Sequence, residues 1–327
     1  MLLEFPLWLL PTLLIALACD ALFGEPGWLY RRVPHPVVLI GRSIGWLEAR
    51  LLVPVAAEGR KRIMGIILLI IVTMGAAGLG FILHLGLRIM PGGWLLEGLL
   101  ASTLLAQRSL VEHVAAVATG LEQSLAEGRK AVSMIVGRDP ERLDAAGVGR
   151  AAVESLAENL SDGVVAPLFW MVVAGLPGLL AYKAVNTLDS MIGHKSERYR
   201  AFGWASARLD DLMNLIPARL TGLLLCCAGT FWRQARFSSS IRIMLRDAPE
   251  HRSPNAGWPE AAMAAALGLR LAGPRVYGGV VVADGWMGHG RSEVDATDIR
   301  RAVALAWAAW WLAVIALLLA LLLSVSI

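Results

Sequence analysis

Charged residues are scarce in this chain. Asp, Glu, Lys and Arg make up 17% of its 327 residues, whereas soluble domains carry about 25%. Hydrophobic residues reach 57%, and 33 glycines add to the apolar share. This composition excludes a disordered chain, a collagen-like fibre and a nucleic-acid-binding domain, so no nucleic-acid partner is expected. It indicates a protein that places long apolar runs in a lipid bilayer.

Cysteine and the familiar phosphate-binding motifs are also rare or missing. The three cysteines, Cys19, Cys226 and Cys227, lie in apolar stretches without metal-ligand spacing, so we expect small buried side chains rather than a disulfide or a metal site. The Walker A pattern is absent, because the stretch Gly193–Ser196 lacks the upstream glycine that the motif requires. No C-x-x-C pair appears either. A nucleotide would have to bind here through an unfamiliar arrangement.

Two apolar runs are long enough to cross about 30 Å of hydrocarbon. They are Ile63–Leu83 and Val303–Ile327, and neither contains a charged residue. The stretch Gly163–Tyr182 is uncharged too, but it is interrupted by Pro167, Gly175, Pro177 and Gly178. Such a segment is either a broken span or a re-entrant element, which membrane proteins tolerate where protein covers the backbone.

Three further segments are weaker candidates for membrane spans. Phe5–Cys19 is bounded by acidic residues and lacks the basic start of a secretory signal, so it is expected to be a retained first helix. Gly92–Gln107 and Leu212–Trp232 are each interrupted by polar residues. Together the runs predict an all-α, polytopic integral membrane protein with four to six transmembrane or re-entrant helices, five being the central expectation. We expect a single membrane domain over 1–327.

The distribution of Lys and Arg predicts the orientation in the membrane. Ten Lys or Arg residues lie between Arg233 and Arg301, and seven lie between the first two spans. The tail after Arg301 carries no charge. Both basic segments are therefore expected to be cytoplasmic, with both termini outside and the protein in the cell membrane. An active site would then face the cytoplasm.

An acidic stripe precedes the broken apolar segment. Arg150, Glu154, Glu158 and Asp162 recur every four residues, so on a helix they share one face. Asn159 lies beside them. Carboxylates at this spacing repel one another. Either an interhelical salt bridge that includes Arg150 or a divalent cation such as Mg²⁺ would offset this repulsion.

The segment Tyr182–Asn214 is the most polar part of the chain between two apolar runs. A solvated connecting loop would explain its charges. A functional site would explain why Asn186 and Asp189 share a helix face beside an apolar run, with Asp210, Asp211 and Asn214 repeating that pattern. The candidate cations and base in it are Lys183, His194, Lys195, Arg198 and Arg208.

Two shorter polar stretches complete the set. In Ser253–Glu260 two prolines and a glycine enforce a turn, and Glu260 is expected to open an apolar helix over Ala261–Leu271. Ser253, Asn255 and Trp258 are its candidate binding residues. The Pro34–Arg42 stretch contains a histidine between prolines, and by itself it says little.

These polar stretches resemble one family. The strings AAVESLAENLSDGVVAPLFW, YKAVNTLDSMIGHKSERYRAFGWASARLDDLMNLIPARL and SPNAGWPEAAMAAALGLRL are similar to those of the CobD/CbiB family, as are the stretches Asp20–Pro26 and Pro34–Arg42. Members of that family are integral-membrane adenosylcobinamide-phosphate synthases of cobalamin synthesis. The resemblance covers residues from about 10 to 320.

The resemblance implies an ATP- and Mg²⁺-dependent amide ligase. Its substrates would be adenosylcobyric acid, a corrinoid, and (R)-1-aminopropan-2-ol or its phosphate. Since a carboxylate resists attack by an amine, we expect its activation as an acyl phosphate. Our role assignments follow from that chemistry: Mg²⁺ ligands Glu154, Glu158, Asp162, Asp210 and Asp211; catalytic residues Lys183, Asn186, Asp189 and the base His194; phosphate- or substrate-binding residues Lys195, Arg198, Arg208, Asn159, Ser253, Asn255 and Trp258.

Other function classes remain open on the sequence. A small-molecule transporter also uses broken apolar segments, although the chain shows no internal repeat. AmpE-like membrane proteins resemble the family in outline and are described as signalling proteins, so a non-catalytic role is the second alternative. Other membrane enzymes of cobalamin assembly are expected partners. For one active site to use all the polar stretches, Gly163–Tyr182 or Leu212–Trp232 must be re-entrant or broken.

Overall fold

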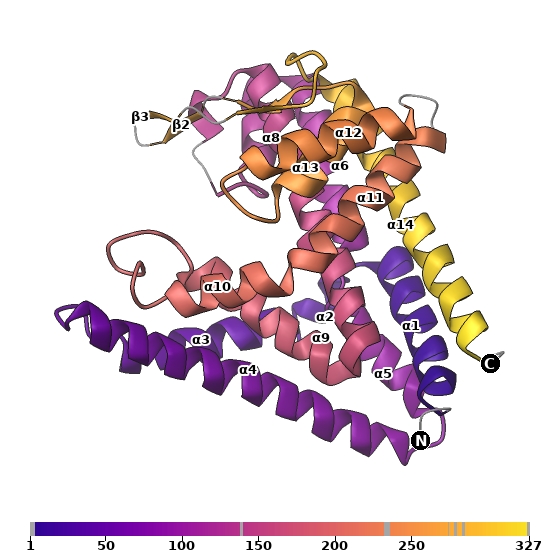
Figure 1. Cartoon of the computed structure of the whole chain (residues 1–327). Helices are drawn as coiled ribbons and strands as arrows, with labels where there is room; N and C mark the ends of the chain where they lie inside the picture. The colour runs from indigo at the N-terminus through magenta and orange to yellow at the C-terminus, as the bar shows by residue number, and fades with distance from the viewer. Residues whose placement is uncertain are drawn as a thin grey trace. The chain divides into compact units, whose positions relative to one another are not determined.

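The computed structural model describes residues 4–137, 140–231, 236–273, 275–277, 280–282 and 285–325, and most of them are helical (Figure 1). The α-helices are α1 (Glu4–Phe23), α2 (Gly27–Tyr30), α3 (Pro36–Leu51), α4 (Glu58–Arg88), α5 (Gly93–Ser102), α6 (Gln107–Gln123), α7 (Leu125–Val132), α8 (Ala145–Leu160), α9 (Ala166–Ile192), α10 (Trp204–Met213), α11 (Leu215–Phe231), α12 (Phe237–Asp247), α13 (Gly257–Leu267) and α14 (Ala296–Val325). The predicted all-α class is confirmed.

Short elements complete the secondary structure. They are the 3₁₀ turns η1 (Pro140–Arg142) and η3 (Ala248–Glu250), the π-helical turn η2 (Ser161–Val165), and the strands β1 (Leu271–Ala272), β2 (Arg275–Tyr277), β3 (Val280–Val282) and β4 (Trp286–Met287). Strand β1 pairs antiparallel with β4, and β2 pairs antiparallel with β3. The strands are short connectors between helices.

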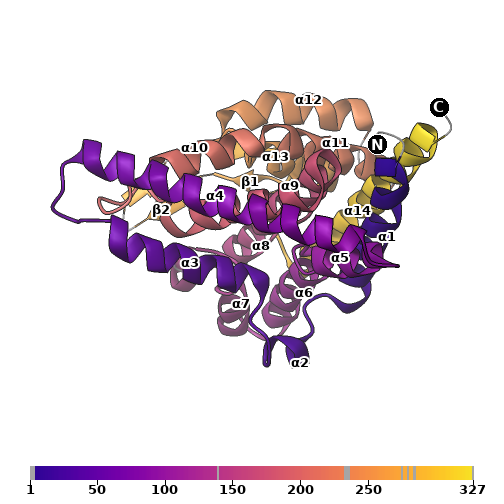
Figure 2. The same ribbon diagram turned by 90° about the horizontal axis from the view of Figure 1, so that it is seen from below.

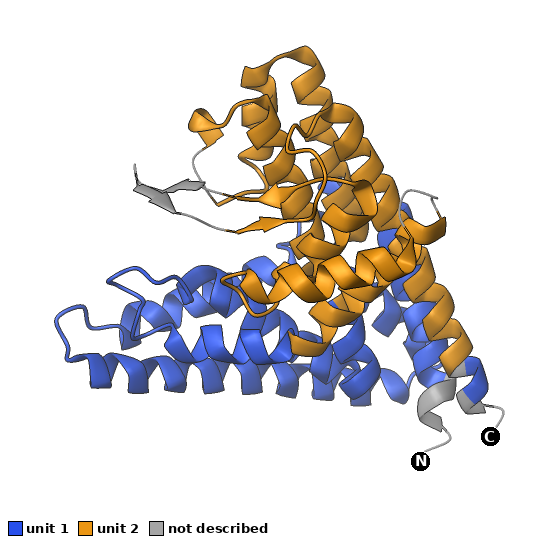
Figure 3. Cartoon of the chain, turned by 45° about the horizontal axis from the view of Figure 1, so that its top comes forward, with its two compact units in different colours: residues 1–106, 166–214, 321–327 blue, residues 107–165, 215–320 orange. Residues whose placement is uncertain are grey.

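The chain forms two compact units (Figure 3). Unit 1 contains residues 1–106, 166–214 and 321–327, and therefore α1–α5, α9 and α10. Unit 2 contains residues 107–165 and 215–320, and therefore α6–α8, α11–α13, the strands and most of α14. The expectation of one domain over 1–327 stays a prediction.

Three helical segments of the described chain are long and apolar enough to cross a membrane: 58–88, 145–192 and 296–320. A fourth candidate combines α10 and α11, which are interrupted at Asn214. The described residues thus contain three or four candidate spans, at the lower end of the expected four to six transmembrane or re-entrant helices. The run Gly92–Gln107 does not form a span, because α5 has ten residues and extends only about 15 Å.

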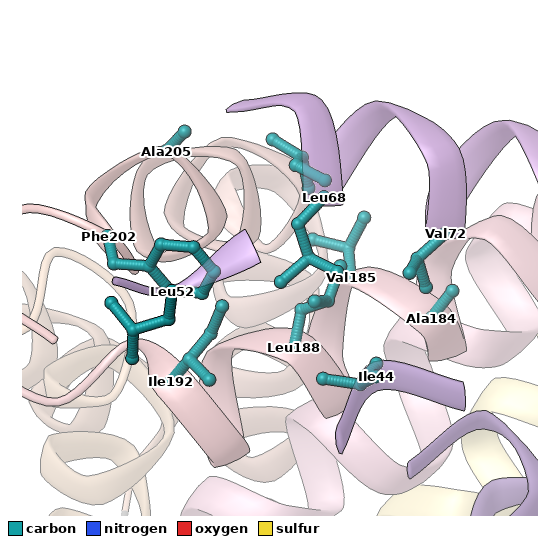
Figure 4. Packing of buried hydrophobic residues seen from close by; sticks show 11 residues of the cluster. Ile44, Leu52, Leu68, Val72, Ala184, Val185, Leu188, Ile192, Phe202 and Ala205 are labelled. Carbon is teal, nitrogen blue, oxygen red and sulfur yellow. The ribbon is translucent and has the colours of Figure 1, made fainter. Parts of the chain in front are cut away.

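Unit 1 is built around contacts of α4 with α9 and α3 (Figure 2). Leu68 and Val72 of α4 belong to one buried cluster with Val185 and Leu188 of α9, and Ile44 of α3 joins it (Figure 4). Glycines let the backbones approach closely. A Cβ on Gly80 of α4 would lie 2.8 Å from the Pro177 Cα atom.

Helix α9 is broken near its middle. Ala174 and Gly175 leave the helical conformation, and Gly175 adopts φ 62° and ψ −156°, which is accessible to glycine almost alone. Pro177 follows at the start of the second helical part, where a missing N–H is harmless. The sequence prediction that Gly163–Tyr182 is interrupted is thus confirmed. The second part of α9 carries the polar residues described next.

Candidate functional site

The second part of α9 presents polar side chains along one face. Lys183, Asn186 and Asp189 follow one another at three-residue spacing, so they lie on the same side of the helix. Lys183 is buried to 9% exposure, whereas Asn186 and Asp189 are partly exposed. The Asn186 side-chain amide donates a hydrogen bond of 3.3 Å to Asp210 of α10. The expected shared face of Asn186 and Asp189 is confirmed.

Asp210 is the buried centre of this polar group. Its second carboxylate oxygen accepts from the Asn214 side-chain amide at 3.0 Å, and the Tyr182 hydroxyl donates to the Asn214 side-chain oxygen Oδ1 at 2.9 Å. Burial of a carboxylate is costly unless hydrogen bonds compensate it. The charges of Asp189 and Asp211 also reach Asp210. The network therefore fixes the orientation of the Asp210 carboxylate, with the carboxylates of Asp189 and Asp211 nearby.

Asp189 lies in the last turn of α9. Its carbonyl oxygen accepts from the Gly193 N–H at 2.7 Å. A Cβ on Gly193 would lie 1.9 Å from one Asp189 carboxylate oxygen. Only glycine therefore leaves room for the Asp189 carboxylate in its present position.

The remaining candidates of this stretch lie on the loop of residues 193–203 and in α10. His194 and Lys195 are exposed on it, and the charge of Lys195 reaches Asp211. Arg208 pairs with Asp211 at 3.9 Å. Arg198 donates to Glu48 of α3 at 2.7 Å, and its expected role in binding phosphate stays a prediction. In this structure Arg198 therefore helps to hold the loop against α3.

His35 brings the Pro34–Arg42 stretch into the same unit. Its Nδ1 accepts from the Val37 N–H at 3.2 Å at the start of α3, so the proton of the neutral ring resides on Nε2. Burial is the main cause that lowers the His35 pKa, and the Lys183 charge also lowers it, while Glu25 raises it. The Pro34–Arg42 stretch, which indicated little by itself, thus brings His35 close enough to Lys183 for their charges to interact.

The acidic stripe lies in unit 2 and is not continuous. Helix α8 ends at Leu160, and Asp162 falls in the π-helical turn η2, which changes the side-chain direction. Glu154 is buried and accepts from the Ala272 N–H at 2.8 Å, whereas Glu158 is exposed. Glu154 and Glu158 share a face of α8, as expected from their four-residue spacing, whereas Asp162 lies beyond the end of that helix.

Two polar neighbours of the stripe also have defined positions. The Asn159 amide donates to the Ser155 carbonyl at 2.9 Å, and the Arg150 guanidinium donates to the Ser292 carbonyl at 2.7 Å. Asn159 is exposed, so a ligand can reach its side chain. Arg150 instead helps to tie α8 to the segment before α14.

The Ser253–Glu260 stretch forms a compact turn in unit 2. The Ser253 hydroxyl accepts from the backbone N–H groups of Asn255 and Ala256, each at 3.2 Å. Arg219 of α11 stacks 4.4 Å from the Trp258 ring centroid and reaches the Asn255 side chain at 3.5 Å. The helix here is Gly257–Leu267, so the expected start at Ala261 was four residues late.

A complete metal cage is not preformed. Within the described residues, no group of three or more His, Cys, Asp or Glu side chains is placed to hold a metal ion. The five expected ligands are divided between the units: Glu154, Glu158 and Asp162 in unit 2, Asp210 and Asp211 in unit 1. Since Mg²⁺ usually takes one or two carboxylates together with substrate phosphates, the acidic group around Asp210 fits such a partial site.

Several residues of these networks were not found by sequence reasoning. They are His35, Glu48, Tyr182 and Arg219. Tyr182 ends one apolar run and Arg219 interrupts another. Polar residues at such places indicate functional groups, so this pattern could have identified both. Glu48 gives no local signal, because its partner lies 150 residues away in sequence.

The comparisons with known proteins agree with one another. The family described as CobD/Cbib protein matches residues 13–306. The protein called "Cobalamin biosynthesis protein CobD" of Sinorhizobium sp is 52% identical over 92% of this chain and 94% of its own length. Proteins of the same name are 50% identical in Rhizobium meliloti (strain 1021), over 92% of this chain and 93% of theirs, and 49% identical in Rhodobacter capsulatus, over 90% and 91%.

No solved structure matches the chain significantly. The family match extends through both compact units, and the curated relatives cover nine-tenths of the chain or more. This coverage includes every polar stretch described above. The chain therefore belongs to the CobD/CbiB family of cobalamin biosynthesis proteins.

Proposed function

We propose that this protein is a biosynthetic enzyme that attaches aminopropanol, or its phosphate, to a propionate carboxylate of adenosylcobyric acid. The observation that carries the proposal is the group of acidic, amide and basic side chains around Asp210 in unit 1. A connecting loop has no need of a buried carboxylate held by two amides. The relatives' name, "Cobalamin biosynthesis protein CobD", supports a role in that synthesis.

The proposed reaction has two steps. The substrate carboxylate first attacks the γ-phosphorus of ATP, so that an acyl phosphate forms and ADP leaves. The neutral amine then attacks the acyl carbon, the C–N bond forms, and inorganic phosphate departs with the former carboxylate oxygen. The attacking nitrogen loses one proton to a base before it attacks and another as the amide forms. The proposal thus consumes one ATP for each amide bond.

The residues of unit 1 supply the groups that these steps require. Asp189 and Asp210 would hold Mg²⁺, which would offset the charge of the ATP phosphates. Lys195 and Arg208 are exposed beside Asp211 and would bind phosphate oxygens. His194, exposed on the same loop, would accept the proton of the amine.

The roles proposed in unit 2 concern binding. The proposed Mg²⁺ ligands in this unit are Glu154, Glu158 and Asp162. Glu154 would bind Mg²⁺ less readily than the carboxylates around Asp210, because it already accepts a backbone hydrogen bond. Asn159, Ser253 and Trp258 would contact substrate. The cell membrane, a cytoplasmic active site and association with other membrane enzymes of cobalamin assembly also belong to this proposal.

Turnover by the purified protein tests the proposal. The full chain in lipid nanodiscs is incubated with adenosylcobyric acid, aminopropanol phosphate, ATP and Mg²⁺, and the amide product is identified by mass spectrometry. We expect one ADP per amide and no product when Mg²⁺ is chelated. Asp189→Asn should lower turnover by about 10² or more, whereas Asp295→Asn, on an exposed side chain of unit 2, should not. Absence of amide product under all conditions contradicts the proposal and favours a transporter or a signalling protein.

A further inference from the structure

Helix α11 of unit 2 carries a half-buried arginine, Arg219, at a point where it interrupts the apolar run of the helix. No carboxylate oxygen of the described residues lies within 4.0 Å of its guanidinium nitrogens. Charged side chains in membrane helices and in protein interiors are normally paired. The absence of a counter-ion in the described part of the chain indicates that Arg219 receives an anion from outside the chain.

The guanidinium group of Arg219 is held in place from two sides. It lies 4.4 Å from the Trp258 ring centroid, and the Trp258 indole N–H donates to the Pro254 carbonyl oxygen at 3.2 Å, which fixes the ring. Its Nη1 donates to the Leu215 carbonyl oxygen at 2.7 Å and reaches the Asn255 side-chain oxygen at 3.5 Å. A cation that is already stacked and hydrogen-bonded loses little further freedom when it binds a ligand.

A second edge of the same guanidinium is open. Both hydrogen bonds use Nη1, and the Nε and Nη2 groups make none with the described residues. Neither of these nitrogens is buried, so a ligand can reach them. Two neighbouring N–H groups of a guanidinium form parallel hydrogen bonds to two oxygens of a phosphate or a carboxylate. This edge of Arg219 is therefore suited to a bidentate oxyanion.

Close packing of α11 against α13 keeps the arginine and the indole ring in position (Figure 1). A Cβ on Gly222, three residues after Arg219, would lie 3.1 Å from the Trp258 carbonyl oxygen. Further along α11, a Cβ on Gly229 would lie 2.7 Å from the Ala266 Cβ. Glycine at both positions lets the helices approach each other. The cation and the ring are thus carried by packed helices, which hold a binding site more precisely than loops do.

We propose that Arg219, supported by Trp258 and Asn255, binds the phosphate group of (R)-1-aminopropan-2-ol phosphate. This inference rests on the proposed function. A phosphate monoester carries a charge of about −1.5 to −2 at pH 7. Arg219 would supply the missing counter-charge and orient the phosphate through two parallel hydrogen bonds. The phosphorylated amine would then be preferred over free aminopropanol.

The other two proposed substrates fit this site less well. The triphosphate of ATP needs Mg²⁺ and several cations, whereas Arg219 is a single cation with no carboxylate of the described residues beside it. The corrinoid carboxylate must attack phosphorus with one of its oxygens, which a bidentate arginine would occupy. The phosphate of the amine takes part in neither proposed step, so it can remain bound to Arg219 throughout the reaction.

Binding of the two forms of the amine by the full chain tests the inference separately from turnover. Dissociation constants of aminopropanol phosphate and of aminopropanol are measured by titration calorimetry in nanodiscs, with adenosylcobyric acid present and ATP left out. Arg219→Gln should weaken binding of aminopropanol phosphate about tenfold or more and leave binding of aminopropanol unchanged. The matched control is Arg242→Gln, on an exposed position of α12, which should change neither constant.

A second variant guards against a loss of folding, which thermal unfolding of each variant reports. Arg219→Lys keeps the positive charge but lacks the planar pair of donors, so it should weaken binding of aminopropanol phosphate several-fold. Wild-type affinity of folded Arg219→Gln, or of folded Arg219→Lys if the first variant does not fold, overturns the inference. An equal loss of binding for both forms of the amine also overturns it and assigns Arg219 a structural role.

Two further measurements identify other sources of phosphate. Loss of ATP binding or of co-purified anionic phospholipid from Arg219→Gln, with unchanged affinity for aminopropanol phosphate, overturns the inference and assigns the arginine to a nucleotide or a lipid. Binding of aminopropanol phosphate that depends on Arg219, in a protein that makes no amide, supports the inference and overturns only the proposed reaction.

Discussion

The contact of Asp189 with Gly193 shows how one missing side chain positions a carboxylate. Asp189 receives the Gly193 N–H on its carbonyl oxygen, and its carboxylate occupies the volume where a Cβ of residue 193 would lie. A larger residue must displace either the carboxylate or the backbone that carries it. The position of Asp189 therefore depends on glycine at residue 193.

Gly193→Ala should lower turnover strongly and leave the protein folded. Displacement of a catalytic group by about 1 Å costs on the order of 10²-fold in rate. Steady-state kinetics and thermal unfolding of the purified variant check this expectation. Gly59→Ala is the matched control, since a Cβ there meets no atom within 4 Å; equal activity of both variants would show that the position of Asp189 is irrelevant to the reaction.

His35 should make stability depend on pH in the acidic range. Its pKa is lowered in the folded protein, while an unfolded histidine titrates near 6.5. The unfolded chain therefore binds the proton more readily below about pH 6.5. The stabilising contribution of His35 is complete above that pH and is lost as the pH falls through its lower folded value.

The melting temperatures of wild type and His35→Gln measure this dependence. The advantage of the wild type should be larger at pH 7.5 than at pH 5, with His113→Gln as the exposed control. A difference that is constant across this range, or that grows in acid, contradicts the assignment of a lowered pKa.

At the residue scale, the sequence located the polar stretches but not their partners. The spacing of Asn186 and Asp189 was sufficient to predict a shared helix face, because helical periodicity is local. The bond from Arg198 to Glu48 depends on the packing of segments 150 residues apart. No local pattern contains that information, so Arg198 was expected to be available for phosphate.

The break in α9 is the main feature at the scale of single elements. Proline and glycine in Gly163–Tyr182 predicted an interruption, and the structure places it at Ala174 and Gly175. The π-helical turn η2 was not predicted, because an i to i+5 turn leaves no composition signal. The α10–α11 interruption at Asn214 follows the polar residues that weakened Leu212–Trp232 as a span.

Gly175→Ala should destabilise the protein by about 1–3 kcal/mol, since its backbone conformation is strained for any residue with a Cβ. Chemical or thermal unfolding in nanodiscs measures the effect. Gly86→Ala is the control, because Gly86 is an exposed position of α4 where a Cβ meets no atom within 4 Å. It should be neutral or stabilise the protein by up to about 1 kcal/mol. A Gly175→Ala variant as stable as Gly86→Ala would mean that α9 is continuous in the membrane.

For the whole molecule, the two ends of α4 give the orientation a direct test. Arg60, Lys61 and Arg62 lie in its first turns, whereas Arg88 alone lies at its end. By the positive-inside rule the first end should be cytoplasmic. Val55 and Ile89, which flank α4, are 94% and 85% exposed and are suitable for labelling.

Val55→Cys and Ile89→Cys are each introduced after the three free cysteines have been replaced by alanine. A membrane-impermeant thiol reagent should label residue 89 in intact spheroplasts and residue 55 only in inverted vesicles. Reversed labelling would show that the proposed orientation is wrong. Labelling of both positions from one side would show that α4 does not cross the membrane.

The alternation of the two units along the chain affects the order in which the protein can be completed on the ribosome. Residues 107–165 of unit 2 are followed by the unit 1 residues 166–214 before unit 2 resumes at 215. At translation rates of about 5–20 residues per second, this interval lasts roughly 2–10 s. Glu154 must wait longer still, until Ala272 has been synthesised, before its carboxylate meets the backbone N–H that it binds in the finished protein. We therefore expect the contact between α8 and β1 to form late, after most of the chain has been synthesised.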